Sequence, residues 1–386
     1  MIIAADEAIP YLQAAFSRVG ELRLFSGRSV RPSDVREADA LIVRSVTEVG
    51  ADLLEGSSVR FVGTATIGMD HIDLDYLKAR GIYIANAAGC NAKSVAEYVI
   101  AALLETAEVK GWRLSGKSIA VIGVGHIGSL VEKMAAALGM EVLLCDPPLR
   151  ESTGDERYRC LDEVLDADVL TLHVPLTTEG RYPTWHMIDG GVLQRLSPRQ
   201  YLINTARGAV VSGSDLKRAL RARRIEGAVL DVWEGEPQID YDLLDMIDLG
   251  TPHIAGSGLD GKVCGTAMML EALCRFFGIQ ERWDSRDMFP QPQWLRPQRG
   301  VDGQNAVRSV ILQAYDIRRD DASLRALRGM PENAAAERFD RLRIDYSLRC
   351  EFTHFIVELA EKNCLAATFK ALGFQVVNPA LNSSTH

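Results

Sequence analysis

The chain has 386 residues, of which 47% are hydrophobic and 25% charged, an ordinary composition for a globular protein of two or three domains. Its formal net charge of −9 argues against a nucleic-acid partner, because phosphate backbones are bound by clustered lysine and arginine. No apolar run approaches the roughly 20 residues needed to cross a bilayer, and the start has no signal-peptide pattern. The seven cysteines are scattered and form no C-x-x-C pair. We therefore expect a cytoplasmic protein that has no metal site and binds neither nucleic acid nor a membrane.

Short apolar runs recur along the chain and predict the buried strands of parallel sheets, because segments able to form helices separate most of them. The α/β alternation stops near Ile279, and a charged segment from Asp316 to Arg343 is predicted to be helical, with two internal breaks. The expected strands are Ala40–Val43, Val59–Val62, Ile82–Ala85, Ser118–Ile122, Glu141–Cys145, Val169–Leu172, Tyr201–Ile203 and Ala228–Leu230.

A long helix is predicted from Ser94 to Glu108. Ser94, with Glu97 three residues later, has the pattern of a capping box, in which each side chain reaches an unpaired backbone N–H at the start of a helix. We expect this helix to carry the chain from a first α/β domain into a second.

A glycine-rich turn after the strand Ser118–Ile122 predicts a dinucleotide site. Its sequence is Gly123-Val-Gly125-His-Ile-Gly128. Gly123 permits the tight turn, Gly125 lets the backbone approach a pyrophosphate, and Gly128 lets helix and strand pack closely. Asp146 ends the next strand, where an acid accepts hydrogen bonds from ribose hydroxyls and repels a 2′-phosphate. The motif therefore predicts NAD rather than NADP.

An arginine, a glutamate and a histidine follow later segments of the same predicted sheet. Because ligands bind beyond the carboxyl ends of parallel strands, Arg207, Glu236 and His253 are expected in one site. An arginine can clamp a carboxylate, a histidine can exchange a proton near neutral pH, and a carboxylate can fix the tautomer of that histidine. Each residue alone would be ordinary. Together they predict that Arg207 orients a 2-hydroxy acid, that His253 exchanges its hydroxyl proton, and that Glu236 tunes His253.

Four segments resemble the D-isomer-specific 2-hydroxyacid dehydrogenases: Gly123–Gly128, Asn204–Gly208, Asp231–Pro237 and Thr251–Gly256. The resemblance covers most of residues 1–280. It implies an α/β fold with a Rossmann NAD-binding domain, a flavodoxin-like substrate domain and a smaller α+β C-terminal dimerisation domain. The implied boundaries are 1–93 with 255–284 for the substrate domain, 94–254 for the NAD-binding domain and 285–386 for the dimerisation domain.

Further segments resemble one branch of this family: Leu41–Val49, Thr64–Asp73, Ala88–Asn91, Cys145–Pro148 and an extra-long loop at Gly256–Thr266. The resemblance implies a homodimer that oxidises a small phosphorylated hydroxy acid, 4-phospho-D-erythronate, to (R)-3-hydroxy-2-oxo-4-phosphobutanoate on the way to pyridoxal 5′-phosphate. Two alternatives remain open. One is a phosphoglycerate dehydrogenase or hydroxypyruvate reductase type of enzyme, and the other is an NAD-sensing protein-binding module.

The family pattern also implies roles for single residues. Catalysis is expected at Arg207, Glu236 and His253, and substrate contacts at Ser45 and Thr66. Beside the three glycines, cofactor contacts are expected at His126, Ile127, Asp146, Pro175, Ala206, Arg207, Gly208, Asp231 and Gly256. Arg44 adds positive charge that either binds the phosphate or forms an ion pair. Ser257 stands where the family usually has tyrosine, so this substrate contact keeps a hydroxyl but loses reach.

Overall fold

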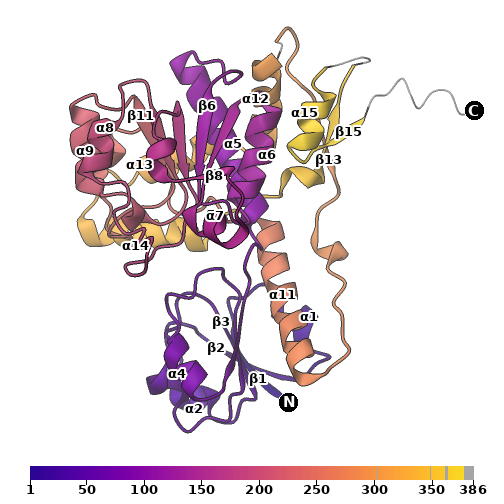
Figure 1. Ribbon diagram of the computed structural model, residues 1–386. Coiled ribbons are helices and arrows are strands. Elements are labelled where there is room, and N and C mark those ends of the chain that lie inside the picture. The colour runs from indigo at the N-terminus through magenta and orange to yellow at the C-terminus, as the bar shows by residue number, and fades with distance from the viewer. Residues whose placement is uncertain (302, 348, 361–363, 378–386) are drawn as a thin grey trace, which may run out of the picture. The chain divides into compact units, whose positions relative to one another are not determined.

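The computed structural model describes residues 1–301, 303–347, 349–360 and 364–377. These form two compact units, each built on a parallel sheet (Figure 1). The first unit is Met1–Asn91 with Gly258–Pro290, and the second is Ala92–Ser257 with the described residues from Gln291 onward, which we call the C-terminal segment. No helix in the described ranges is long and apolar enough to cross a membrane.

The first unit has a five-stranded sheet in the order β2-β1-β3-β4-β5, which is the flavodoxin-like order. Its strands are β1 (Ile2–Asp6), β2 (Glu21–Phe25), β3 (Ala40–Val43), β4 (Phe61–Thr64) and β5 (Tyr83–Asn86). Helices α1 (Leu12–Phe16) and α11 (Leu259–Phe277) share a core with one face of the sheet, and α2 (Pro32–Val35), α3 (Ala51–Leu54) and α4 (Leu74–Ala79) cover the other.

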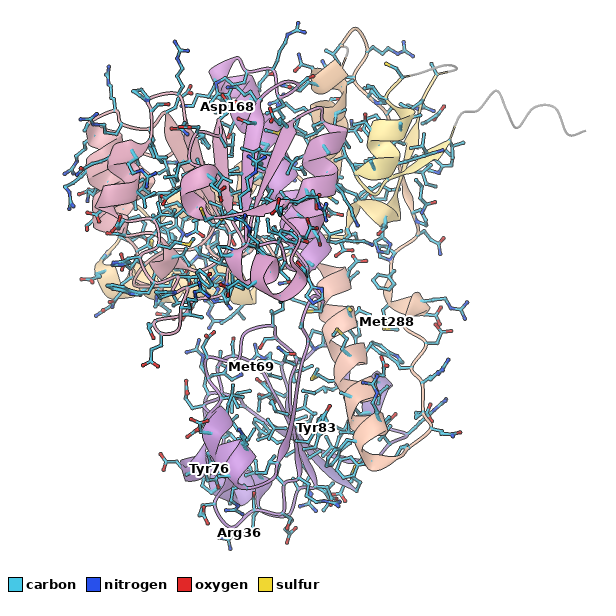
Figure 2. The ribbon with its side chains drawn as sticks, in the orientation of Figure 1. Arg36, Met69, Tyr76, Tyr83, Asp168 and Met288 are labelled. Atoms are coloured by element: carbon cyan, nitrogen blue, oxygen red, sulfur yellow. The ribbon has the colours of Figure 1, made fainter. Side chains whose placement is uncertain are left out.

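Burial on both faces explains the continuous apolar sequence of the central strands in this unit. Every residue of β3 and β4 is buried. At the sheet edge, Tyr83 stacks on Phe61 at 5.7 Å between ring centroids and contacts Phe276 of α11 at 5.2 Å (Figure 2). The apolar face of α11 is thereby held against the sheet.

The second unit has a seven-stranded parallel sheet in the order β12-β11-β10-β9-β6-β7-β8. Its direction of growth reverses between β6 and β9, and such a switch point opens a ligand crevice at the carboxyl ends of the strands. The strands are β6 (Ser118–Ile122), β7 (Glu141–Cys145), β8 (Tyr158–Arg159), β9 (Val169–Leu172), β10 (Tyr201–Asn204), β11 (Gly227–Leu230) and β12 (Leu249–Gly250).

Helices cover both faces of this sheet. Helix α5 (Ala92–Lys110) is buried along almost its whole length, and the polar side chains of Ser94, Glu97 and Glu105 are buried with it. It packs on one face with α6 (Gly128–Ala137). The other face carries α8 (Gly190–Arg195), α9 (Gly213–Arg221) and α10 (Tyr241–Leu244), while α7 (Pro147–Thr153) follows β7.

The C-terminal segment shares both hydrophobic cores of the second unit. Val307 and Phe355 belong to the core around α5, whereas Leu324 and Phe339 belong to the core on the opposite face. Its strands β13 (Gln293–Leu295), β14 (Phe355–Glu358) and β15 (Gln375–Val377) form a parallel sheet. Its helices are α12 (Gly303–Ala314), α13 (Ile317–Arg325), α14 (Glu332–Ile344) and α15 (Ala366–Ala371). The three-domain division expected from the sequence stays a prediction.

The α/β fold class and its parallel sheets are confirmed, and all eight predicted strands exist with ends within two residues. Three local predictions were wrong. The helix from Asp316 to Arg343 has one break rather than two, and the loop expected up to Thr266 is helical from Leu259. The capping box is absent because α5 begins at Ala92, so that Ser94 and Glu97 lie inside the helix.

We predict that Phe339→Ala destabilises the second unit far more than Ile344→Ala does. Both residues lie in α14, but Phe339 is fully buried whereas Ile344 is 58% exposed. The buried truncation should cost about 3 to 5 kcal/mol of unfolding free energy, and the exposed one less than about 0.5 kcal/mol. Urea unfolding followed by tryptophan fluorescence measures both. Equal losses would show that α14 is not part of this core.

Candidate active site

The glycine loop after β6 has the geometry expected of a dinucleotide turn. Gly123 has a φ of 90°, and a Cβ there would lie 2.8 Å from the backbone of His173. A Cβ on Gly128 would overlap the carbonyl oxygen of Gly123, whereas one on Gly125 would meet no atom within 4 Å. Two glycines are therefore required by close packing, and the third leaves open space beside the backbone.

This loop can hold a pyrophosphate. The backbone N–H groups of Gly125, His126 and Ile127 have no acceptor among the described residues, and they stand at the start of the ten-residue helix α6. Such donors, together with the helix dipole, favour a bound anion. The residues present therefore fit NAD at this site.

Asp146 stands at the end of β7, beside the glycine loop. One carboxylate oxygen accepts a hydrogen bond from the Val124 N–H at 2.8 Å, and the other caps α7 through the Leu149 N–H at 3.0 Å. An ionised carboxylate has about four lone-pair sites, so acceptor capacity remains for a ribose. The glycine loop thus fixes the position of Asp146, which is predicted to bind the ribose of the cofactor.

The loop after β10 carries Arg207 and is held from within. The Asn204 side-chain amide donates to the Arg207 carbonyl at 3.0 Å and accepts from the Ala206 N–H at 3.0 Å. At Gly208 any side chain would overlap the carbonyl of Trp233. The arginine loop therefore packs directly against the loop that ends at Glu236.

Glu236 and His253 form a hydrogen-bonded pair. The Glu236 Oε2 and His253 Nδ1 atoms are 2.8 Å apart, and the Trp233 N–H donates to Oε1 at 2.8 Å. Burial opposes ionisation of Glu236, but the bonds from His253 and Trp233 and the nearby Arg343 charge hold its pKa below the usual range. Glu236 is therefore a carboxylate that accepts a hydrogen bond from Nδ1–H of His253, and this tautomer has a lone pair on Nε2.

The loop that carries His253 is organised by the buried carboxylate of Asp231. This carboxylate accepts hydrogen bonds from the Thr251 hydroxyl at 2.6 Å, the Ile254 N–H at 2.8 Å and the Ala255 N–H at 3.0 Å. The Asp231 carbonyl accepts from the His253 N–H at 2.7 Å. His253 itself has a φ of 56°, a left-handed conformation that needs such support.

His173 is a site residue that the sequence analysis missed. It follows β9, and its ring lies between the hydroxyls of Thr171 at 3.0 Å and Thr205 at 3.3 Å. Burial lowers its pKa to about 3, so the ring is neutral at physiological pH. The available signal was its place directly after a predicted strand, at the same sheet edge as the other three loops.

The remaining predicted residues of the second unit lie in the same loops. Pro175 follows His173, and its carbonyl accepts from the Thr184 hydroxyl at 2.5 Å. Gly256 and Ser257 follow the His253 loop, and the Ser257 N–H donates to Ile254. The carboxylate of Asp231 already accepts hydrogen bonds from the His253 loop. The cofactor contacts expected of Asp231 and of the other residues stay predictions.

The predicted substrate residues of the first unit follow β3 and β4. Arg44 donates to both oxygens of the buried Asp6, at 2.8 and 3.3 Å, so the ion pair that the sequence left open is present. Ser45 is exposed, and the Thr66 hydroxyl lies 2.7 Å from that of Thr64. Lys262, which the sequence analysis missed, has its pKa lowered by burial and by the charge of Arg44, and no acid pairs with it among the described residues.

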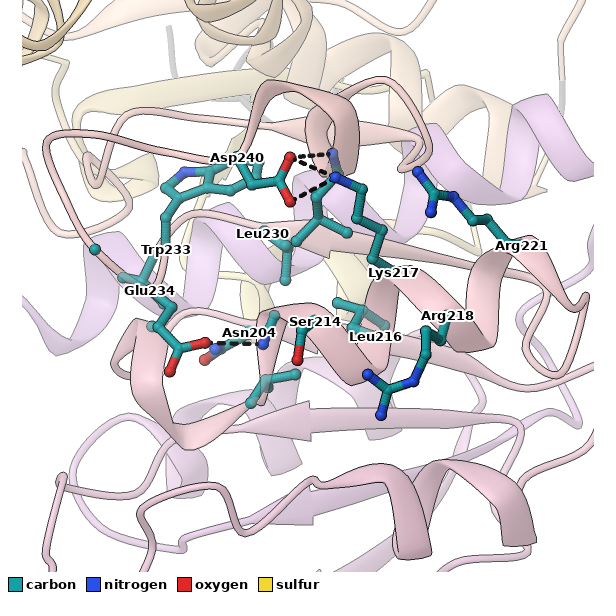
Figure 3. Close-up of a pocket in the computed structure, with 16 residues that line it drawn as sticks. Asn204, Ser214, Leu216, Lys217, Arg218, Arg221, Leu230, Trp233, Glu234 and Asp240 are labelled. Carbon is teal, nitrogen blue, oxygen red and sulfur yellow. Dashed lines mark hydrogen bonds and ion pairs between the residues drawn. The ribbon is translucent and has the colours of Figure 1, made fainter. Parts of the chain in front are cut away.

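A separate pocket of about 480 Å³ lies between α9 and the loop after β11 (Figure 3). Lys217 in this pocket binds the Asp240 carboxylate at 2.8 and 2.9 Å, and Glu234 accepts from the Gly213 N–H at 3.0 Å. Neither the glycine loop nor His253 lines it. The pocket is therefore distinct from the dinucleotide turn and from the loop that carries His253.

A dinucleotide loop and a paired glutamate and histidine, set on one edge of a doubly wound sheet, define the class as nicotinamide-dependent dehydrogenases of 2-hydroxy acids. Residues 89–255 match the family model of the D-isomer specific 2-hydroxyacid dehydrogenase NAD binding domain, and residues 290–373 match a domain of unknown function, DUF3410. The chain belongs to the erythronate-4-phosphate dehydrogenase family.

Two relatives carry this assignment. The erythronate-4-phosphate dehydrogenase of Marinobacter nauticus is 45% identical over 97% of this chain and 100% of its own length. The enzyme of the same name from Hahella chejuensis is 42% identical over 97% of this chain and 99% of its own. The similarity therefore extends through the C-terminal segment.

Solved structures share the fold over a smaller part of the chain. D-lactate dehydrogenase from Aquifex aeolicus, complexed with NAD and lactic acid, matches with a TM-score of 0.60 at 28% identity, over 72% of this chain and 96% of its own. A glyoxylate/hydroxypyruvate reductase from Sinorhizobium meliloti matches with a TM-score of 0.60 at 23% identity, over 73% of this chain and 94% of its own. Each of these two structures covers less than three quarters of this chain.

We predict that Asp146→Ser relaxes cofactor choice toward NADP. Serine keeps a side-chain oxygen that can cap α7, but it removes the charge that repels a 2′-phosphate. The ratio of kcat/KM for NADP to that for NAD should rise about tenfold or more. Steady-state kinetics with both cofactors measure it, and an unchanged ratio would show that Asp146 does not read the ribose.

We predict that His173→Asn weakens the dependence of stability on acid pH. The unfolded histidine binds a proton below about pH 6.5, whereas the folded ring stays neutral down to about 3. Stability contributed by the neutral ring is therefore full above about pH 6.5 and is lost as pH falls, by at most about 1.4 kcal/mol per pH unit. Urea unfolding between about pH 7.5 and 5 compares the two proteins. Parallel curves would contradict the prediction.

Proposed function

We propose that this chain oxidises 4-phospho-D-erythronate to (R)-3-hydroxy-2-oxo-4-phosphobutanoate with NAD, a step toward pyridoxal 5′-phosphate. The observation that carries the proposal is the Glu236–His253 pair, which stands with the Arg207 loop on the sheet edge that also carries the glycine loop. Relatives similar over nearly the full length bear the name of this activity.

The cofactor would be held by the loop Gly123–Gly128, by the start of α6 and by Asp146. When bound, NAD supplies the two-electron acceptor for the hydrogen at C2 of the substrate. The chain itself contributes the anion-binding N–H groups, the acid that selects against a 2′-phosphate, and the neighbouring loops that carry the reacting side chains.

The proton chemistry falls to His253. Its Nδ1–H is directed to the Glu236 carboxylate, so Nε2 accepts the proton of the C2 hydroxyl on oxidation and returns it on reduction. The ionised Glu236 stabilises the imidazolium that forms. Arg207 clamps the substrate carboxylate and polarises the C2 oxygen, because its fork of donors matches two acceptor atoms.

The phosphate of the substrate would be bound in the first unit. Arg44, Ser45 and Thr66 follow two adjacent parallel strands, and Lys262 adds a second positive charge near Arg44. Because Arg44 is already paired with Asp6, Lys262 would contribute more than Arg44 to the attraction of the phosphate. In the second unit, Ser257 keeps a hydroxyl for a substrate contact where the family usually has tyrosine.

We also propose that the chain acts as a homodimer in the cytoplasm. Trp294 lies on the edge strand β13 of the C-terminal sheet and is 59% exposed, which offers an apolar surface and unpaired backbone groups to a second copy. Cys145, Cys160, Cys274 and Cys364 are free thiols, as is usual in a reducing compartment.

The test compares oxidation of 4-phospho-D-erythronate, 3-phosphoglycerate and D-glycerate by the purified chain, with a 2-oxo acid present to recycle bound NADH. We expect turnover with the first substrate alone. We expect His253→Ala to lose at least about a hundredfold in kcat, because the general base is missing, while it still binds NADH. Preference for another acid would overturn the substrate, and normal turnover by His253→Ala would overturn the proton transfer.

A further inference from the structure

The C-terminal segment reaches the loop that carries the proposed proton acceptor. The Arg349 guanidinium donates through Nη2 to the carbonyl oxygens of Ala255 and of Ser94, the latter at 2.6 Å. Ala255 stands two residues after His253. Arg349 is only 9% exposed, so these hydrogen bonds are shielded from water.

Arg349 is itself held in place by aromatic groups. Its guanidinium lies over the ring of Tyr315, 4.0 Å from the centroid. The Tyr315 and Tyr346 hydroxyls both donate to the Asp320 carboxylate at 2.8 Å. A cation over an aromatic face is stabilised when water is excluded, so the Tyr315 ring holds a guanidinium whose buried Nη1 has no hydrogen-bond partner among the described residues.

The start of α5 links the same two regions. The Ser94 hydroxyl donates to Glu351 at 3.1 Å, and Glu97 accepts from the Phe352 N–H at 2.8 Å. These are the two side chains that the sequence pattern had assigned to a helix cap. One turn further along α5, Tyr98 bonds the Thr251 hydroxyl at 2.7 Å, and Thr251 in turn donates to Asp231.

We propose that Arg349 is a positioning residue for the reaction, through which the C-terminal segment holds the His253 loop so that the imidazole faces Glu236. The inference rests on the proposed function. Asp231 holds the N–H groups of this loop and Arg349 holds its Ala255 carbonyl, so both sides of the backbone after His253 are bound. Removing one side frees a loop whose histidine has a left-handed conformation.

Substitutions of Arg349 in the full-length chain test this role against a matched control. The control is Arg308→Gln, because Arg308 also joins the C-terminal segment to α5, with Nε and Nη2 at 3.0 and 2.7 Å from Glu105, but does not contact the His253 loop. We expect Arg349→Gln to lower kcat about tenfold or more, since displacement by about 1 Å is enough for such a loss. The dissociation constant of NADH, measured by fluorescence, should change less than about twofold.

The conservative variant keeps the test decisive if Arg349→Gln does not fold. Arg349→Lys retains a charged donor but loses the planar fork, so we expect its kcat to lie below that of wild type and above that of any folded Arg349→Gln. We expect Arg308→Gln to lower the unfolding temperature while its kcat stays within about twofold of wild type. Equal kcat in folded Arg349→Lys and Arg308→Gln would overturn the proposal.

A second readout separates this inference from the proposed function. The rate at which diethyl pyrocarbonate modifies His253, followed by peptide mass spectrometry, needs no substrate. We expect this rate to rise in the Arg349 variants and to stay unchanged in Arg308→Gln. Failure of the wild-type chain to oxidise 4-phospho-D-erythronate would overturn the proposed function alone, whereas an unchanged modification rate in the Arg349 variants would overturn the positioning role.

Discussion

The buried carboxylate of Asp231 is the constraint on which the candidate site depends. It directly follows β11, and three donors from the loop after β12 converge on it, so the loops after these two neighbouring strands bring Glu236 and His253 together. A carboxylate removed from water is tolerated only when hydrogen bonds replace its hydration. The hydrogen bonds that replace the hydration of Asp231 therefore also fix the conformation of the loop that carries His253.

The parallel sheet of the second unit gathers the chemistry along one edge. The glycine loop follows β6, His173 follows β9, the Arg207 loop follows β10, and the paired Glu236 and His253 follow β11 and β12. Each loop contacts the next. Gly123 packs against His173, the His173 ring is hydrogen-bonded to the Thr205 hydroxyl, and Gly208 packs against Trp233. The loops that we propose for nucleotide binding and for proton transfer are therefore joined by one continuous set of contacts.

The C-terminal segment is built into this unit rather than appended to it. Phe355 shares the core around α5, and Phe339 shares the core on the opposite face of the sheet. The same segment brings Arg343 within 3.9 Å of Glu236 and Arg349 to the His253 loop. Residues 290–373 match a family model of their own, so this support comes from outside the matched NAD binding domain at residues 89–255.

Much of the fold could be predicted because its signals are local. Continuous apolar runs predicted most of the central strands, although the inner strand β1 was missed, and the spacing of Gly123, Gly125 and Gly128 predicted the nucleotide turn. The edge strand β2 escaped prediction because most of its residues are exposed, and β12 because it has only two residues.

Long-range contacts could not be predicted in this way. Ser94 resembled a helix cap, yet its partner Glu351 lies 257 residues away, and no local pattern reports such a contact. The partners of Asp231 are likewise set by how two strands pair. His173 could have been found from its position after a strand, but the burial that keeps its ring neutral is a property of the folded sheet.

In the proposed reaction, the hydrogen at C2 of 4-phospho-D-erythronate leaves directly for the cofactor while the C2 hydroxyl proton goes to the protein. The most direct measurement is a single turnover of substrate deuterated at C2, followed by mass spectrometry of the reduced cofactor. We expect to find the deuterium in the reduced nicotinamide, because transfer is direct. Deuterium released to water would contradict it, since the bond at C2 would then have been broken by proton abstraction.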